Sequence, residues 1–231
     1  MPGAGLEPAC PKAPDFKSGA SDQFRHPGRR RVTRWRGSVP RVIHDVNVAF
    51  AALGVAGQVL VGLGVLALFL AFAHVPGPLD VIRSLFWGYE LWAAFVVAAV
   101  ATGGSLYFSQ IAGYVPCELC WFQRICMYPL SIILLLAAID GEYRIVRYVW
   151  PLPLVGACVS IYHLLVENHV VSTPAACQVG AGCTVKWINE FGYMTIPTLA
   201  LTAFVLLIGF LGLASSGSAG EAGTLPAHAQ R

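Results

Sequence analysis

Long apolar stretches separated by short polar connectors dominate the chain. A helix needs about 20 consecutive apolar residues to cross a bilayer. Stretches of about that length, or slightly shorter, cover residues 49–73, 91–112, 121–139, 148–166 and 194–214. The pattern predicts an all-α integral membrane protein with five candidate transmembrane helices.

Composition supports the same class. The 231 residues are 56% hydrophobic and only 12% charged, whereas a soluble domain carries about a quarter charged residues. The mean hydropathy is +0.65. These values exclude an ordinary soluble domain, and the lipid bilayer is therefore an expected partner.

The polar segments predict how the chain is organised. Residues 1–47 are rich in Pro, Gly and Arg and show no apolar period, so we expect a disordered tail there. Residues 48–90 contain the first apolar helix and a short amphipathic segment, which is typical of an interfacial helix. Residues 91–214 hold the other four spans, and residues 215–231 form a second low-complexity tail, which we also expect to be disordered.

Arginine is concentrated just before the first span. Seven arginines lie between Arg25 and Arg41. Such a cluster is compatible with nucleic-acid binding. An apolar span follows it closely, however, and this favours a basic flank that faces anionic lipid. We therefore expect no nucleic-acid partner.

Four cysteines form two close pairs, Cys117-Glu-Leu-Cys120 and Cys177-x5-Cys183, each beside an apolar span. Two residues between thiols at a helix N-terminus is the spacing of redox-active dithiols, because the helix dipole favours a thiolate there. Arg124 follows Cys120 by one helical turn, so its guanidinium can provide a positive field for a thiolate or a reduced cofactor oxygen. The alternative is an interfacial arginine that reaches lipid phosphate.

Counting spans places both cysteine pairs on one side of the membrane, because two spans separate them. The connector between those two spans carries Arg144 and Arg147, and the positive-inside rule makes it cytoplasmic. Both pairs then face the extracytoplasmic side, where disulfides persist. A structural zinc site and a pair of inert disulfides are the alternatives, but we expect no metal because a zinc knuckle has no evident task there.

The first apolar stretch conflicts with this orientation. If residues 49–73 cross the membrane, the arginine-rich N-terminus lies outside with the cysteines, against the positive-inside rule. The stretch can instead form a hairpin, the tail can be translocated despite its charge, or translation can begin further downstream. We expect a fifth transmembrane helix.

The run from Pro116 to Pro129, PCELCWFQRICMYP, closely resembles the core motif of the disulfide bond formation protein B family, and most of all its BdbC-type branch. The run from Asn189 to Pro197, NEFGYMTIP, resembles that branch as well. The resemblance covers about residues 91–214. It implies a four-transmembrane-helix bundle core, to which the N-terminal apolar helix is an addition. Family members are quinone-dependent membrane oxidases that reoxidise a thioredoxin-like thiol oxidase outside the cytoplasm.

The resemblance implies a role for each site residue. Cys177 and Cys183 would form the disulfide that a reduced DsbA/BdbD-like oxidase attacks, with Cys177 the expected site of the mixed disulfide. Cys117 and Cys120 would reoxidise that pair. Cys120 would then pass two electrons to a quinone, ubiquinone or menaquinone, held beside Arg124. The implied protein is a multi-pass thiol–disulfide oxidoreductase of the bacterial cytoplasmic membrane.

Other residues and functions remain open at this point. His163 and His169, near the outer end of the fourth span, are candidates for quinone binding or proton transfer, or are simply interfacial. Cys126 and Cys158 lie within spans and are expected to be packing residues. A quinone reductase similar to vitamin K epoxide reductase is an alternative function. A non-catalytic membrane protein with structural disulfides or zinc is an alternative from another class.

Overall fold

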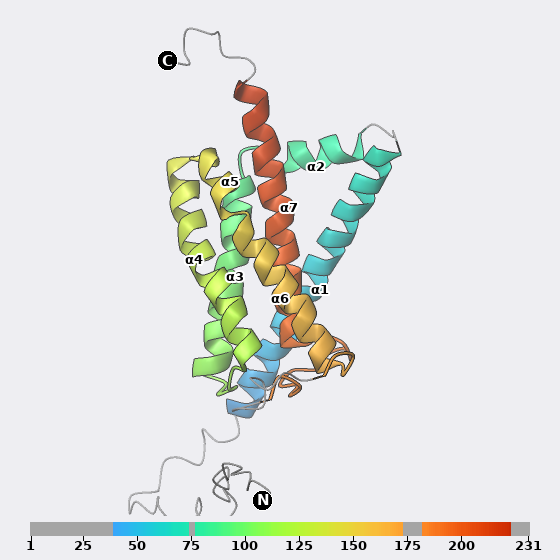
Figure 1. Cartoon of the computed structure of the whole chain (residues 1–231), viewed down its shortest axis with the longest axis vertical. Helices are drawn as coiled ribbons and strands as arrows, with labels where there is room; N and C mark the ends of the chain where they lie inside the picture. The colour runs from blue at the N-terminus through green and yellow to red at the C-terminus, as the bar shows by residue number, and fades with distance from the viewer. Residues whose placement is uncertain (1–38, 74–76, 173–181, 223–231) are drawn as a thin grey trace, which may run out of the picture. The chain divides into compact units, whose positions relative to one another are not determined.

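The computed structural model describes residues 39–73, 77–172 and 182–222 (Figure 1). The chain divides into two compact units, Met1–Arg41 and Val42–Arg231. The first unit lies almost wholly outside the described residues. The same is true of most of the predicted tail 1–47 and of Cys177.

The described residues form helices joined by short connectors, and their only β-structure is an isolated bridge between Glu190 and Met194. The elements are α1 (Val39–Phe72), α2 (Pro78–Phe86), α3 (Glu90–Gln110), α4 (Glu118–Asp140), the 3-10 helix η1 (Tyr143–Ile145), α5 (Val146–Val149), α6 (Pro151–Glu167) and α7 (Ile196–Ala222). Helices α1, α3, α4 and α7 are long and apolar enough to cross a membrane. Together η1, α5 and α6 make up a further candidate span, bent by 40°. The predicted all-α membrane fold is confirmed.

Local sequence explains where the helices begin and end. Cys117 is the N-cap of α4, and Gly141 ends that helix in the left-handed conformation with a φ of 64°, which glycine adopts without strain. The bend in the fourth span falls directly before Pro151. Proline is well suited to the first position of a helix because it has no backbone N–H to pair with the preceding turn.

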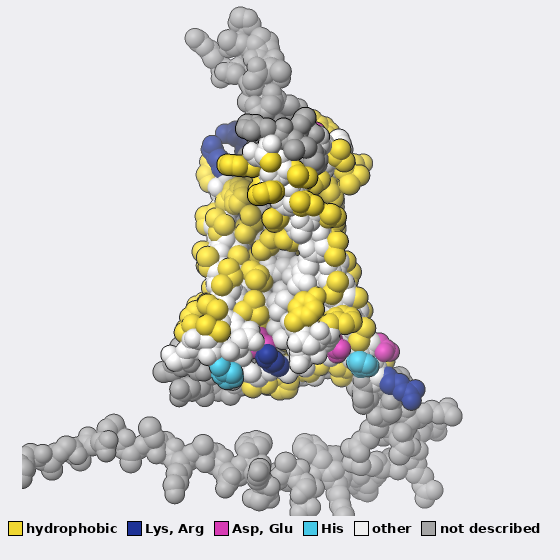
Figure 2. Space-filling view, turned by 90° about the vertical axis from the view of Figure 1, so that its right-hand side faces the viewer, with side chains coloured by type: hydrophobic (Ala, Val, Ile, Leu, Met, Phe, Trp, Pro, Cys, Tyr) yellow, Lys and Arg dark blue, Asp and Glu magenta, His cyan; other side chains and the backbone are white. Residues whose placement is uncertain are grey.

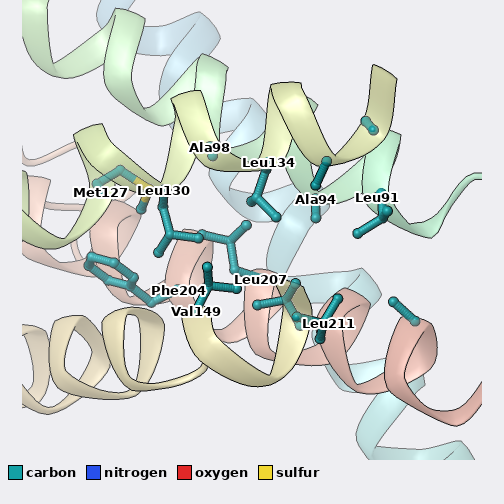
Figure 3. Close-up of a cluster of buried hydrophobic side chains, with 14 of the residues drawn as sticks. Leu91, Ala94, Ala98, Met127, Leu130, Leu134, Val149, Phe204, Leu207 and Leu211 are labelled. Atoms are coloured by element: carbon teal, nitrogen blue, oxygen red, sulfur yellow. The ribbon is translucent and has the colours of Figure 1, made fainter. Parts of the chain in front are cut away.

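The core lies among α3, α4, α6 and α7. Helix α3 packs against α4 and α7, and α6 packs against the same two helices. Figure 3 shows Leu130 and Leu134 of α4 pointing toward Phe204 and Leu207 of α7, and all four are fully buried. A Cβ atom at Gly156 of α6 would lie 2.3 Å from the ring of Phe204, so the glycine is needed for this close approach. The core is therefore almost entirely apolar.

Both connectors that carry the predicted cysteine pairs lie at the same end of this bundle (Figure 1). They join α3 to α4 and α6 to α7, whereas η1 and α5 lie at the opposite end. Figure 2 shows hydrophobic side chains over the middle of one face, with charged side chains gathered toward the two ends. The structure thus places the two connectors as the span count predicts. The side of the membrane that this end faces stays a prediction.

The first apolar stretch is one continuous helix, α1, and not a hairpin. It begins at Val39, ahead of the boundary predicted at residue 48. The short amphipathic segment forms α2, which runs across the end opposite the cysteines (Figure 1), where Phe86 contacts Phe210 edge to face. Helix α7 continues to Ala222, beyond the end predicted at residue 214, because extending an existing helix is much easier than starting one.

Candidate functional site: a dithiol beside a cavity

Cys117 and Cys120 meet at the start of α4. Cys117 has an extended backbone at the N-cap, and Cys120 lies in the first turn. Residues three apart share one side of a helix, and the two sulfur atoms lie 3.1 Å apart. Both are free thiols; Cys117 is buried, with 7% of its surface exposed, and Cys120 is half-buried. The pair is therefore a dithiol close enough to be oxidised to a disulfide.

His163 of α6 lies beside this dithiol. Its Nε2 atom is 3.6 Å from Cys117 Sγ, and its Nδ1 atom is 3.5 Å from Nε2 of Gln123 on α4. Gln123 Nε2 also donates a hydrogen bond to Ser160 Oγ at 3.1 Å. His163, Gln123 and Ser160 are all buried. A chain of polar side chains therefore connects the dithiol to the interior of the bundle.

These surroundings hold the pKa of the Cys117 thiol well below its ordinary value, at about 4. The hydrogen bond with the Cys120 side chain is the largest cause, burial acts in the opposite direction, and His163 lowers the pKa further. A thiolate is both the attacking and the leaving group of thiol–disulfide exchange. Cys117 is therefore the sulfur best prepared for exchange with a second disulfide.

Cys183, from the second predicted pair, lies next to Cys117. It is disulfide-bonded and only 2% exposed. It belongs to a small apolar cluster with Cys117, Leu119 and Val166, against which Cys120 packs. The structure thus brings together three of the four predicted cysteines. Cys177 lies outside the described residues.

Arg124 lies one turn after Cys120, as the sequence indicates. Its Nη2 atom donates a hydrogen bond to the backbone oxygen of Ser105 on α3 at 3.1 Å. Its guanidinium also lies over the ring of Trp121, 5.3 Å from the ring centre. These contacts direct the cation along the bundle beside the dithiol, which differs from an arginine extended into the lipid headgroups.

A cavity of about 370 Å³ lies beside the dithiol. Cys120, Arg124 and His163 line part of it, and apolar side chains of α1, α3 and α7 line most of the rest. A quinone has an apolar ring and tail and two carbonyl oxygens that accept hydrogen bonds. An apolar space with a cation and a thiol along its wall fits such a molecule. Arg124 is one of the lining residues that can donate to a carbonyl oxygen, as Lys186 is.

Glu167 is a residue of this site that sequence reasoning missed. It lies one turn after His163 on α6, is buried and lines the same cavity. Thr195 Oγ1 donates a hydrogen bond to its carboxylate at 3.1 Å, and Lys186 Nζ lies 3.7 Å from it. The available clue was the four-residue spacing from His163, which places both side chains on one helix face.

One group of side chains among the described residues has the geometry to hold a metal ion. The ligand atoms of Cys117, Cys120 and His163 all lie within 4.8 Å of one another. The zinc alternative considered from sequence used both cysteine pairs. Cys183, however, is in a disulfide, and the metal ligand must be a thiolate. A possible metal site is therefore limited to the dithiol and the histidine.

The other cysteines and the second histidine considered from the sequence are not part of the dithiol site. Cys126 is buried in the main apolar core, and Cys158 is exposed on α6. His169 is exposed and has a left-handed backbone with a φ of 57°. Of the two histidines singled out from the sequence, the structure therefore brings only His163 to the cysteines.

Comparisons with known proteins identify the relatives of this chain. The family model described as Disulfide bond formation protein DsbB matches residues 89–214. Disulfide bond formation protein C of Bacillus subtilis (strain 168) is 50% identical over 125 residues, which cover 53% of this chain and 90% of that protein. Probable disulfide formation protein C 1 of Bacillus anthracis is 42% identical over 120 residues, or 52% of this chain and 86% of that protein.

A third bacterium also carries a similar protein. Probable disulfide formation protein of Deinococcus radiodurans is 41% identical over 133 residues, which cover 53% of this chain and 86% of that protein. No solved structure gave a significant match to this chain. In each of these relatives the match covers most of the relative but only about half of this chain.

Proposed function

Because the chain belongs to the disulfide bond formation protein DsbB family, we propose that it is a quinone-dependent thiol–disulfide oxidoreductase of the bacterial cytoplasmic membrane. Membership of the family makes it a membrane oxidoreductase of disulfide bond formation. Its electron donor would be a reduced extracytoplasmic thioredoxin-like oxidase of the DsbA/BdbD kind. Its electron acceptor would be a membrane quinone, ubiquinone or menaquinone.

The position of Cys117 between a disulfide and a cavity carries this proposal. Its sulfur shares an apolar cluster with disulfide-bonded Cys183. It also lies 3.1 Å from Cys120, which lines the cavity with Arg124. Cys183, Cys117 and Cys120 all line this cavity, so exchange among them would provide a short path for electrons from an outer disulfide to a lipid-soluble acceptor.

The first exchanges would take place between protein thiols. A partner thiolate attacks the Cys177–Cys183 disulfide that the resemblance implies, and resolution of the mixed disulfide releases oxidised partner and leaves both cysteines reduced. The Cys183 thiolate then attacks Cys117 of an oxidised Cys117–Cys120 pair, and Cys120 leaves as a thiolate. Attack of Cys177 on Cys183 restores the outer disulfide and releases Cys117, whose low pKa makes it a good leaving group.

Reoxidation of the inner dithiol would complete the cycle. Forming the Cys117–Cys120 disulfide removes two electrons and two protons, which convert one quinone to one quinol. Arg124 would orient a quinone oxygen beside Cys120 by hydrogen bonding. His163 lies 3.6 Å from Cys117 Sγ and would hold a proton released there.

Purified protein tests the reaction directly. With a reduced thioredoxin-like substrate, the wild type should reduce one mole of quinone for each disulfide it forms. Serine substitution at Cys117, Cys120, Cys177 or Cys183 should abolish net turnover, whereas Cys158→Ser, at an exposed thiol of α6, should retain it. Cys183→Ser should in addition trap the partner through Cys177 on non-reducing gels. A wild type that reduces neither ubiquinone nor menaquinone would refute the proposal.

We further propose that the cysteine end faces the extracytoplasmic side, because the opposite end carries Arg144 and Arg147 in η1 and α5. Single reporter cysteines at two exposed positions, Glu118→Cys and Glu142→Cys, separate the two orientations in a background in which serine replaces every native cysteine. A membrane-impermeant maleimide applied to intact cells should label only the reporter at position 118. Labelling of only the reporter at position 142 would reverse the orientation.

A metal site at Cys117, Cys120 and His163 is the second candidate, because their ligand atoms already lie within 4.8 Å of one another. Zinc bound by two thiolates and an imidazole has one open position and would prevent disulfide formation. This candidate predicts one zinc per chain in purified reduced protein and no quinone reduction until a chelator is added. A metal-free protein with full turnover excludes it.

A further inference from the structure

Helix α1 lies outside residues 89–214, which match the family model, and yet it lines the cavity beside the dithiol. The α1 residues in the lining are Phe50, Leu53, Gly54, Ala56, Gly57 and Leu60. Most of them recur at three- and four-residue spacing, so they share one face of the first half of α1. A helix additional to the family core therefore forms one wall of this cavity.

The wall fits closely against α7 on one side. A Cβ atom added at Gly54 would lie 2.4 Å from Cδ2 of Leu199 and 3.1 Å from Sδ of Met194. One added at Gly57 would lie 3.0 Å from Cγ2 of Thr202. Leu199 and Thr202 themselves line the cavity. A larger side chain at either glycine would therefore have to displace the side chains that it meets across this contact.

On its other side the wall fits against α3. A Cβ atom added at Gly104 would lie 2.5 Å from Cε1 of Phe50, and the Phe50 ring meets Phe108 edge to face at 5.2 Å. Phe108 in turn stacks on Tyr114 at 6.0 Å, and Tyr114 stacks on Trp187 at 5.3 Å. A continuous row of aromatic rings therefore runs from α1 to the segment that follows Cys183.

Polar contacts connect the same half of α1 to the connectors at the cysteine end. Buried Asn47 donates a hydrogen bond from Nδ2 to the Tyr114 hydroxyl at 2.9 Å. The Tyr193 hydroxyl donates to Gln58 Oε1 at 3.1 Å. Hydrogen bonds at Asn47 and at Gln58 thus hold the first half of α1 against the connectors.

The glycines in the second half of α1 make no such contacts. A Cβ atom added at Gly62 or Gly64 would meet nothing within 4 Å. Leu63 is 54% exposed, which is close to the 58% of cavity-lining Leu53, whereas Ala67 is buried. The two halves of α1 therefore differ in the contacts at their glycines, and the whole helix is long enough to anchor the chain in a membrane.

We propose that residues 47–60 of α1 form a wall of the quinone site and increase its affinity for the quinone ring and the start of its isoprenoid tail. This inference rests on the proposed function. Apolar side chains on a fourth side of the ring remove more of its surface from lipid and water than a four-helix core alone does. The added helix would thereby determine which quinones the site retains, in addition to anchoring the chain.

Paired glycine substitutions test this inference through binding. In a Cys120→Ser background, which cannot transfer electrons to the ligand, quenching of tryptophan fluorescence reports the Kd of a short-chain quinone. Gly54→Val places a larger side chain against Leu199 and Met194 at the cavity and should raise the Kd about tenfold, a loss of about 1.4 kcal/mol. The matched substitution Gly62→Val, at a glycine with open space around it, should leave the Kd unchanged. Equal Kd values for both variants would show that α1 is only an anchor.

A second pair of variants shortens side chains of α1, so its result does not depend on a shift of the helix. Phe50→Ala opens the wall and should also raise the Kd, whereas Leu63→Ala, on the exposed half, should not. With native cysteines, the same variants should raise the quinone KM and retain kcat at saturating quinone. Unchanged affinity in both Gly54→Val and Phe50→Ala refutes the wall while leaving the proposed function intact. A wild type without quinone-dependent turnover refutes the function itself.

Discussion

Along α4, the buried side chains include polar Gln123 toward the cysteine end and are all apolar from Met127 onward. At the cysteine end, Gln123 is buried and bonded across to α6. At the other end, Leu130 and Leu134 are fully buried among apolar side chains. Burying polar groups lowers stability unless they are hydrogen-bonded, whereas close van der Waals packing of apolar side chains between membrane helices raises it. The same helix therefore stabilises the fold at one end and supports a reactive site at the other.

The largest difference between the ends should appear in stability. Leu134→Ala leaves a cavity in the apolar end and should lower the free energy of unfolding by about 2–5 kcal/mol. Gln123→Leu at the cysteine end replaces a single bonded amide and should change it by less than about 1.5 kcal/mol, while turnover falls. Unfolding in detergent by heat or SDS measures both variants. The control is Ile132→Ala on exposed α4 surface, and equal losses at both ends would contradict the comparison.

A smaller effect is expected on the quinone KM when Arg124, at the cysteine end, is replaced. Arg124→Ala removes the hydrogen bond to Ser105 and the charge beside the cavity, so the quinone KM should rise about tenfold, or about 1.4 kcal/mol. Arg124→Lys keeps the charge but loses the planar donor group and should fall between wild type and Arg124→Ala. Steady-state kinetics at limiting quinone separates the three proteins. Unchanged KM values would make Arg124 a membrane-interface residue.

The smallest expected effect is a displaced pH profile. Because the pKa of Cys117 is lowered to about 4, its thiolate should persist at neutral pH and disappear as the pH falls through about 4. An ordinary thiol titrates near about 8.5. The same shift stabilises the folded dithiol form above about pH 8.5, and this contribution is lost progressively as the pH falls toward about 4.

His163→Gln removes one of the contacts that lower this pKa, so the midpoint of the profile should move to higher pH. The rate of alkylation of Cys117, measured by mass spectrometry between pH 3 and 9, reports the midpoint. The exposed thiol of Cys158 provides an internal reference in the same digest. A midpoint that does not move would remove His163 from the chemistry of the dithiol.

Contacts between neighbouring residues were predictable from the sequence, and contacts between distant ones were not. The spacing of Cys117 and Cys120 at the start of an apolar stretch indicated a dithiol at a helix N-terminus, which the structure places at α4. His163 lies 46 positions from Cys117. The sequence alone could not decide whether His163 or His169 lies near the cysteines. Only the packing of α6 against α4 brings His163, and with it Glu167, to the cavity.

By itself, the sequence determined the membrane class, the apolar spans and the close cysteine spacing, because hydropathy and helix periodicity depend on residues near one another in the chain. The tertiary structure alone decided that α1 contributes a wall to the cavity and that Cys183 reaches Cys117. The glycines at positions 54 and 62 illustrate the reason. They are equivalent in an apolar sequence, yet only Gly54 meets another helix, because a close approach depends on what lies across the gap.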